Sequence, residues 1–242
     1  MPGGKNPFLF YVVYGRVDFT QSLSRSKYRC TEIPDGIEVM SYGPQVHPDV
    51  VSRFRNGYVW DQFAAADAKF AAAIKAQDNC LVLRGEISDP PTLNYLRNVI
   101  GFLTFCLDAG GVAIYDLQIL KWWTPSDWRS RILAAGSSAL HDHAVILLSE
   151  EAGGTQWIHT RGMRKFGRPD LSIHNVLPQD AAAVVELCNR FIEFFALGGI
   201  VAEGQDIRMG SLPSGLKCFY RGDEDDPDFN NAHIEIAPAD GA

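Results

Sequence analysis

Apolar residues along the chain follow two kinds of spacing, and each predicts a different element. Short runs that are apolar throughout, or that alternate with polar residues, predict strands, whereas apolar residues three or four positions apart predict helices. The strand-like runs lie at 8–14, 37–40, 79–87, 112–119, 143–149, 200–209, 216–220 and 232–236, with a hairpin over 155–176. The helical patterns lie at 61–77, from 88 to the glycines at 110 and 111, and at 179–197. Many strands and three long helices favour an α+β fold.

The order of these elements predicts one α+β domain over residues 1–242, built from two packed halves, 1–130 and 131–242. Each half is expected to hold a mainly antiparallel sheet covered by one long helix. A sequence echo joins them, since Phe-Leu-Thr-Phe and Gly-Gly within 102–111 resemble Phe-Ile-Glu-Phe and Gly-Gly within 191–199. The echo suggests a distant internal duplication. The alternative is that any amphipathic helix that ends in glycine before a strand has this pattern.

Two of the long helices carry the clearest core signals. Ser88 and Asp89 can cap the second helix, with prolines following in its first turn. The third helix is expected to turn one apolar stripe inward, formed by Val184, Leu187, Cys188, Phe191 and Phe195. Cys106 and Cys188 lie on the inward stripes, so we expect both thiols to be inaccessible.

The composition is that of a folded protein without a basic surface. Of the 242 residues 46% are hydrophobic and 21% are charged, and the net charge is −7. Seven acidic residues and no Lys or Arg follow Arg221, which leaves 22 residues of each sign in 1–221. Nucleic-acid-binding proteins usually carry a basic face and a high pI, so no nucleic-acid partner is expected.

The chain also lacks the marks of membrane insertion and export. Its apolar stretch at 98–107 is half the ~20 residues that a membrane-spanning helix needs. The N-terminus lacks the apolar core of a signal peptide. The five cysteines are odd in number, scattered and without a CxxC pair, which favours reduced thiols rather than disulfides or a zinc site. We therefore expect a cytoplasmic protein.

The most distinctive segment is Trp157–His174, which reads WIHTRGMRKFGRPDLSIH. It resembles a group of bacterial proteins classed as a domain of unknown function, whose members carry a Thr-Arg-Gly-Leu-x-x-Phe-Gly-x-x-Glu motif. Met163 stands in place of the motif's Leu and Asp170 in place of its Glu, and the resemblance covers about residues 155–210. It implies an α+β fold and a bacterial, intracellular setting, and it assigns no catalytic residue.

Pairing within this segment predicts which side chains share a face. A hairpin centred between residues 166 and 167 places His159 opposite His174 and Arg161 opposite Ser172. Because side chains alternate along a strand, one face is then apolar and fits the core, and the other is polar. The apolar face gathers Ile158, Thr160, Leu171 and Ile173; the polar face gathers His159, Arg161, Asp170, Ser172 and His174.

This polar face is the candidate site. We expect a non-enzymatic module that binds an unidentified anionic ligand or an acidic protein partner, because arginine can hold two oxygens at once and histidine can donate. The expected binding residues are His159, Arg161, Arg164, Lys165, Arg168, Ser172 and His174, with the three basic residues 164, 165 and 168 at the hairpin tip. The structural alternative is an Arg161–Asp170 ion pair on a solvated hairpin, with the tip charges protecting a sheet edge.

A second functional class uses the same face. His159 or His174 could act as a general base in a metal-assisted or histidine-based hydrolase, although no nucleophile is visible beside them. His141 and His143 have the spacing of two metal ligands on one strand, but loop or capping histidines have it equally, so no metal is assigned. The Asp-rich run at 223–228 lacks the glycine and final Glu of an EF-hand and is expected to be a solvated loop. Phosphate- and dinucleotide-binding glycine motifs are also absent, so no cofactor is expected.

Overall fold

A computed structural model describes residues 6–88, 92–134, 140–210, 212 and 214–239. The chain divides into two compact units, each with its own sheet. The N-terminal unit comprises Phe8–Ala139, and the C-terminal unit comprises Leu140–Ala242 with Met1–Pro7. The expected boundary at residue 130 thus falls close to the division near residue 139.

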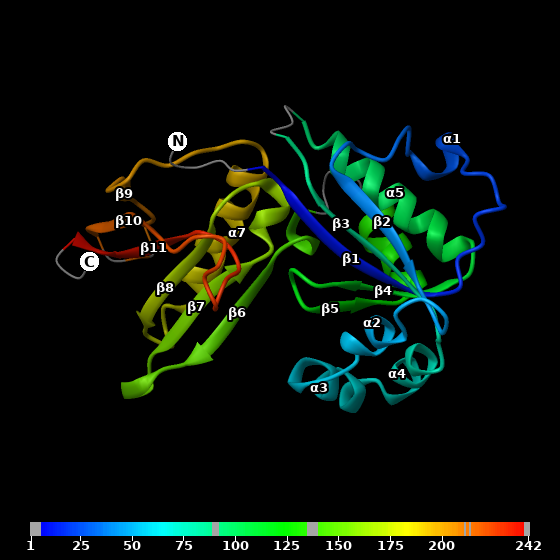
Figure 1. Cartoon of the computed structure of the whole chain (residues 1–242). Helices are drawn as coiled ribbons and strands as arrows, with labels where there is room; N and C mark the ends of the chain where they lie inside the picture. The colour runs from blue at the N-terminus through cyan, green and yellow to red at the C-terminus, as the bar shows by residue number, and fades with distance from the viewer. Residues whose placement is uncertain (1–5, 89–91, 135–139, 211, 213, 240–242) are drawn as a thin grey trace. The chain divides into compact units, whose positions relative to one another are not determined.

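The sheet of the N-terminal unit has five strands in the order β2-β3-β1-β4-β5 (Figure 1). The strands are β1 Phe8–Gly15, β2 Ile37–Tyr42, β3 Cys80–Glu86, β4 Gly111–Asp116 and β5 Lys121–Trp123. All four neighbouring pairs are antiparallel. Strand β1 lies between β3 and β4, so these two strands, which follow each other in the sequence, do not pair with each other.

Among the described residues of this unit, seven helical segments accompany the sheet. They are α1 Arg25–Tyr28, α2 Pro48–Arg53, α3 Tyr58–Ala66, α4 Ala68–Lys75, α5 Asn94–Asp108, α6 Pro125–Asp127 and the π-helix η1 Trp128–Leu133. The single helix expected over 61–77 is wrong. Asp67 leaves helical geometry at φ −138° and ψ 76°, and its side chain accepts a hydrogen bond from the Phe70 amide, which caps a new helix. The second long helix begins at Asn94 with Leu93 at its N-cap, so the prediction that Ser88 caps it is wrong; Asp89 and the two prolines lie outside the described residues.

Helices cover both faces of the N-terminal sheet. α5 packs on one face, where it contacts β1 and β4, and α2 and α4 contact the sheet through β2 and β4 (Figure 1). The second face is a continuous apolar layer in which Trp122 stacks on Tyr115 with ring centroids 4.2 Å apart. Trp60 and Phe63 of α3 close over the same indole at 5.2 and 5.3 Å. Apolar side chains thus fill both sides of this sheet.

The C-terminal sheet has six strands in the order β6-β7-β8-β11-β10-β9. The strands are β6 Val145–Glu150, β7 Gln156–Arg161, β8 Asp170–Val176, β9 Asp206–Ile207, β10 Leu216–Arg221 and β11 His233–Pro238. β8 and β11 are parallel, and the other neighbours are antiparallel. The strand expected over 200–209 is reduced to the two residues of β9.

One long helix packs on this sheet. α7, Ala181–Ala196, contacts β7 and β8, and two short 3-10 helices, η3 Ala152–Gly154 and η4 Met163–Phe166, lie in the connections (Figure 1). The inward stripe predicted for α7 is confirmed, since all five of its expected residues are buried. Cys106 and Cys188 are buried as expected, and all five cysteines are free thiols.

The structure confirms the α+β fold with two mainly antiparallel sheets and a long helix on each. The two sheets differ in strand number, and only the C-terminal one contains a parallel pair. Within the described part of the chain, no helix is long and apolar enough to cross a membrane.

Candidate functional site

The hairpin that carries the expected site residues is present, but its register differs from the prediction. His159 lies opposite Ser172 and Ile158 opposite Ile173, two residues away from the expected pairing of His159 with His174. The turn explains the shift, because its centre falls inside the 3-10 helix η4 instead of after it. An even shift leaves these four residues on their expected faces, although the register shifts by one residue between Gln156 and Ile158. Asp170 does not follow the prediction, because it is buried and accepts a hydrogen bond from Thr160 of the expected core face, so the sorting is confirmed for only part of the hairpin.

The turn of the hairpin is built by two glycines and a buried lysine. Gly162 at φ 110° and Gly167 at φ 65° bracket η4 in left-handed backbone that other residues rarely adopt. Lys165 lies inside, fully buried, and its Nζ donates to the carbonyl oxygen of His143 at 2.9 Å. The expectation that Lys165 belongs to an exposed basic tip is wrong, because η4 packs against α7 and draws this side chain inward.

A buried carboxylate closes the base of the turn. Asp170 accepts hydrogen bonds from the hydroxyl of Thr160 at 2.9 Å, the amide of Met163 at 3.2 Å and the side chain of Asn231 at 2.8 Å. Burial raises the pKa of Asp170 to about 6, against these hydrogen bonds, which favour the ionised form. These three donors satisfy Asp170, so the Arg161–Asp170 ion pair of the structural alternative does not form as a direct contact.

The arginines of the hairpin turn instead toward one loop, which we call the acidic loop and define as residues 222–231. Arg161 Nη1 donates to the carbonyl oxygen of Asp228 at 2.8 Å. Arg164 Nη1 donates to the carbonyl oxygen of Asn230 at 2.8 Å, and its Nη2 lies 3.4 Å from the carboxylate of Glu224. The guanidinium of Arg168 donates to the carbonyl oxygen of Gly167, and the carbonyl oxygen of Arg168 accepts from the side chain of Asn231. The chain thus supplies an acidic segment to its own basic hairpin.

The polar face of β7, β8 and β11 carries a row of stacked rings, which we call the histidine face. His174 stacks on Trp157 at 5.0 Å, and Trp157 stacks on His159 at 3.9 Å. Phe229 of the acidic loop then meets His159 edge-on at 5.5 Å and stacks on His233 at 4.2 Å. Ser172 holds the row in place by accepting a hydrogen bond from the Trp157 indole at 2.9 Å.

Burial keeps the inner imidazoles of this row neutral. It lowers the pKa of His159 to about 4, with Arg161 as the next cause, and it also lowers the pKa of His233, which the Asp226 carboxylate partly opposes. His159 is only 5% exposed, and among the described residues its Nδ1 has no hydrogen-bond partner. The buried Nε of Arg161, two residues further along β7, also has no hydrogen-bond partner among the described residues. Two polar nitrogens therefore lie unpaired on one face of β7.

His174 differs from the inner imidazoles because it pairs with a carboxylate. Its Nδ1 lies 2.7 Å from Glu151 Oε1, and the other oxygen of Glu151 accepts from the amide of Asn175 at 2.8 Å. The side chain of His174 is 40% exposed. A carboxylate that binds one ring nitrogen orients the imidazole and sets which nitrogen carries the proton.

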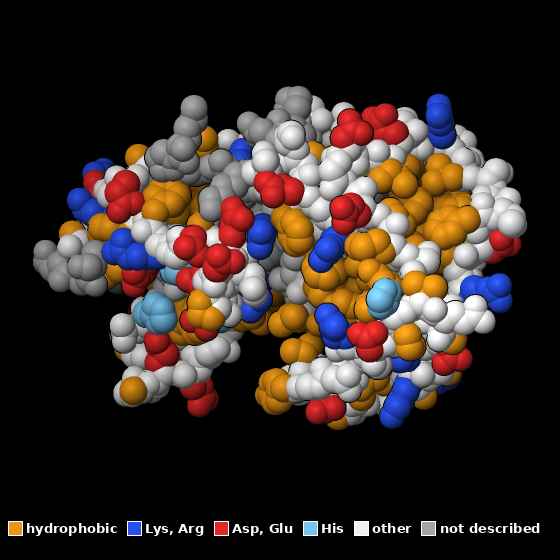
Figure 2. All heavy atoms as spheres, viewed as in Figure 1, with side chains coloured by type: hydrophobic (Ala, Val, Ile, Leu, Met, Phe, Trp, Pro, Cys, Tyr) orange, Lys and Arg blue, Asp and Glu red, His pale blue; other side chains and the backbone are white. Residues whose placement is uncertain are grey.

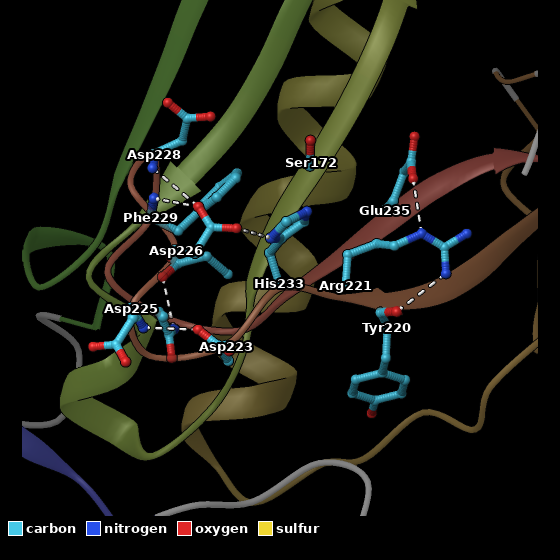
Figure 3. A network of polar contacts seen from close by, with 12 residues as sticks. Ser172, Tyr220, Arg221, Asp223, Asp225, Asp226, Asp228, Phe229, His233 and Glu235 are labelled. Atoms are coloured by element: carbon cyan, nitrogen blue, oxygen red, sulfur yellow. Dashed lines mark hydrogen bonds and ion pairs between the residues drawn. The ribbon is translucent and has the colours of Figure 1, made fainter.

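The acidic loop is folded around Asp226, whose carboxylate accepts from the amides of Asp228 and Phe229 at 3.0 and 3.1 Å and lies 3.7 Å from His233 (Figure 3). Asp223 holds the first turn of the loop by accepting from the amide of Asp225. On the surface, acidic side chains gather over the loop beside a histidine (Figure 2). The expectation of a solvated loop holds for most of the run at 223–228, and the loop is in addition anchored to the histidine face at Phe229, which is 6% exposed.

The second histidine pair does not form one site. His141 and His143 precede β6 instead of lying on it, so they do not share a strand face. His141 bonds to Glu193 of α7 at 2.9 Å, whereas His143 is buried against Phe166, and burial lowers its pKa to about 3. Across the described residues, no group of three or more His, Cys, Asp or Glu side chains is arranged to hold a metal ion.

Sequence reasoning missed the partners that complete the site. Phe229 and His233 come from a loop and a strand more than fifty residues beyond the hairpin, and Glu151 precedes it. The sequence does predict the position of Trp157, because it lies two residues from His159 on the same strand and therefore on the same face. No local pattern indicated the long-range partners, since the parallel pairing of β8 with β11 brings them together.

Comparison with known proteins adds nothing to this geometry. No family model matches the chain, and no curated protein or solved structure matches it. The resemblance of the 157–174 segment to a domain of unknown function stays a prediction.

Proposed function

We propose that the C-terminal unit is a non-enzymatic binding module that recognises an anionic group or an acidic segment of a partner protein at its histidine face. The observation that carries this proposal is the pair of buried, unpaired nitrogens on β7, Arg161 Nε and His159 Nδ1. Buried polar groups are nearly always hydrogen-bonded, and each exception calls for an explanation. An oxygen-rich ligand supplies an acceptor to Arg161 Nε, and also to His159 Nδ1 in the neutral tautomer that carries its proton on that nitrogen.

The surrounding charges favour the same class of ligand. Arg161 uses one terminal nitrogen for the Asp228 carbonyl oxygen, and its Nε stays available on the same guanidinium group. Arg164 and Arg168 flank it and add positive potential, which raises the local concentration of anions. Lys165 does not contribute a direct contact, because it is buried beneath η4.

Calorimetric titration with phosphate, sulfate and acidic peptides tests the proposal. Arg161→Lys keeps the charge and loses the planar fork, so affinity is expected to fall by roughly 1 to 3 kcal/mol, the scale of a charge-assisted hydrogen bond. Arg190→Lys on α7 is the matched control, because Arg190 pairs only with Glu186 on its own helix and is expected to leave affinity unchanged. Equal affinity for all three proteins, or no binding to the wild type, would overturn the proposal for these ligands.

A second candidate is a histidine-based hydrolase, and the Glu151–His174 pair favours it. An imidazole that is oriented by a carboxylate and whose side chain is 40% exposed is suited to act as a general base. Hydrolysis of p-nitrophenyl acetate tests it, with His174→Gln and Glu151→Gln expected to abolish the rate above background. His141→Gln is the matched control, because His141 also pairs with a carboxylate, that of Glu193. A rate that is unchanged in all variants excludes this candidate for that ester.

We also propose that the protein acts in the cytoplasm of a bacterium, without a nucleic-acid partner. The cytoplasmic setting is supported by five buried free thiols, because cysteines of secreted proteins are usually paired. The bacterial setting is implied by the resemblance of the hairpin motif, and the net charge of −7 argues against nucleic acid.

A further inference from the structure

The acidic loop meets the histidine face in the way a bound peptide would. It offers carbonyl oxygens to Arg161 and Arg164, a carboxylate from Glu224, and one aromatic ring from Phe229. It is the loop between β10 and β11, and its last residue, Asn231, is fixed to the hairpin because its buried side chain donates to Asp170 and to the carbonyl oxygen of Arg168. Its contacts are therefore made by an insertion over the face rather than by a strand of the sheet.

We propose that the acidic loop is a built-in occupant of the histidine face, and that the partner is an acidic peptide segment carrying one aromatic residue, which displaces the loop by presenting the same chemistry. This inference rests on the proposed binding function and deepens it by naming the partner class. Two sets of contacts carry it: the ring position and the arginine acceptors.

The ring position is specific for a flat aromatic side chain. Phe229 stacks on His233 at 4.2 Å with an interplanar angle of 21°, and it meets His159 and Trp157 edge-on at 5.5 and 5.9 Å. Stacked and edge-on geometries are those that aromatic pairs prefer over unspecific packing. A partner's Phe, Tyr or Trp would fit these contacts.

The arginine acceptors leave room for a stronger competitor. Arg161 binds the loop through a neutral carbonyl oxygen, and charge-assisted bonds between a guanidinium and a carboxylate are roughly twice as strong as neutral ones. A partner that places a carboxylate at Arg161 would also reach the unpaired Nε, which the loop does not. The loop thus leaves one donor of Arg161, its Nε, without an acceptor.

Competition of this kind makes a quantitative prediction. When an internal segment occupies a site, the apparent dissociation constant of a free ligand equals the intrinsic constant divided by the fraction of molecules whose site is open. Weakening the loop should therefore strengthen binding of a free peptide, although the substitution removes a residue near the site. A ligand that binds elsewhere gives no such gain.

The test uses a labelled peptide with the sequence of residues 222–231, GDEDDPDFNN, in a fluorescence anisotropy titration of the full chain. Phe229→Ala is expected to bind this peptide about 10-fold more tightly than the wild type, because its loop has lost its ring anchor. A peptide with Ala in place of its Phe should lose this gain. Glu224→Gln, a gentler change at a 44%-exposed side chain, should give a smaller gain in the same direction.

The outcomes separate the two proposals. If wild type and loop variants bind the peptide equally, and Arg161→Lys weakens both, the binding function stands and the built-in occupant is wrong. If the peptide binds no variant, including Glu224→Gln with an unchanged circular dichroism spectrum, both are wrong. If Phe229→Ala fails to fold, the gain of Glu224→Gln over wild type decides, and its absence overturns the inference.

Discussion

The two sheets of the molecule differ in what covers their second face. In the N-terminal unit, α5 packs on one face, and Trp60, Phe63 and Trp122 build an aromatic layer on the other. In the C-terminal unit, α7 covers one face, whereas the other carries three imidazoles, Trp157 and Arg161 under the acidic loop. One sheet is thus enclosed by apolar packing, and the other keeps a polar face.

This difference teaches where stability and recognition lie in the chain. Apolar burial contributes roughly 25 cal/mol per Å², so a sheet covered on both faces gains more from packing than one with a polar face. Hydrogen bonds of polar groups on a sheet face contribute little net stability. We expect these groups to contribute mainly to the affinity for a partner. Substitutions of the same kind should therefore lower the free energy of unfolding more in the N-terminal unit than in the C-terminal unit. Substitutions in the C-terminal unit should lower the affinity for a ligand more than those in the N-terminal unit.

The largest expected effect compares two tryptophans. Trp122→Ala should lower the free energy of unfolding by about 4 kcal/mol, the scale of Trp-to-Ala changes in a core, because its indole is 8% exposed and stacks on Tyr115. Trp157→Ala, on the histidine face, should cost about 2 kcal/mol, since its ring is only partly buried. Urea unfolding followed by circular dichroism measures both.

A control at an exposed apolar residue shows what truncation costs without burial. Val46→Ala in the N-terminal unit should be nearly neutral, because Val46 is 53% exposed. Equal costs for the two tryptophans would contradict the comparison of the two sheets.

A pH effect of intermediate size is expected from the buried face of the C-terminal unit. His143 has a folded-state pKa of about 3, below its ordinary value of 6.5, so its contribution to stability is complete above pH 6.5 and is lost as the pH falls toward 3. Between pH 7 and 4.5 the loss is about 2 to 3 kcal/mol, at 1.36 kcal/mol for each pKa unit. His143→Leu should remove this part of the pH dependence, which melting curves at both pH values measure as a difference from wild type. An identical pH slope in the variant would mean that His143 is not buried.

Periodicity predicted most of the fold because the buried faces alternate cleanly. The stripe of α7 and the run of β1 are apolar on the faces that pack, and both elements lie where the pattern placed them. The break between α3 and α4 was missed because Asp67 interrupts an alanine-rich stretch that would otherwise continue as one helix. Its own side chain caps the second helix, a contact that composition does not reveal.

The sequence predicted which strand residues of the site share a face, because this depends on alternation along the strands. Alternation along β7 and β8 correctly placed His159, Ser172 and His174 on one face, because parity survives an even shift. The prediction that Lys165 belongs to the exposed basic tip was wrong, because the 3-10 helix η4 turns this side chain inward, which a tight hairpin turn would not do. Phe229 joins the face through parallel pairing of distant strands, which no local pattern specifies.

A smaller effect is expected at the ion-pair cluster of the N-terminal unit. Asp108 contacts Lys27 Nζ at 2.6 Å, the Tyr28 hydroxyl at 2.8 Å and Arg129 Nη2 at 2.5 Å. Burial raises the pKa of Asp108, but these hydrogen bonds outweigh it and hold the pKa at about 2. Because that pKa lies below the ordinary 3.8, the stabilisation is present above pH 3.8 and is lost as the pH falls toward 2. Asp108→Asn should cost about 1 kcal/mol at pH 7, after allowance for solvent screening, and little at pH 2.5; chemical denaturation at both pH values measures it.

The smallest effect on stability, and the sharpest contrast with Asp108, is expected at Glu224. Its carboxylate lies 3.4 Å from Arg164 and is 44% exposed, whereas the Asp108 carboxylate is 21% exposed and binds three groups. An exposed pair of this kind contributes roughly 0.2 to 1 kcal/mol, so Glu224→Gln should shift the melting temperature by no more than about a degree or two. Raised salt should erase the difference from wild type, because screening acts mainly on exposed pairs. A loss as large as that of Asp108→Asn, measured by the same denaturation, would show that the acidic loop is part of the C-terminal core and not an occupant of its polar face.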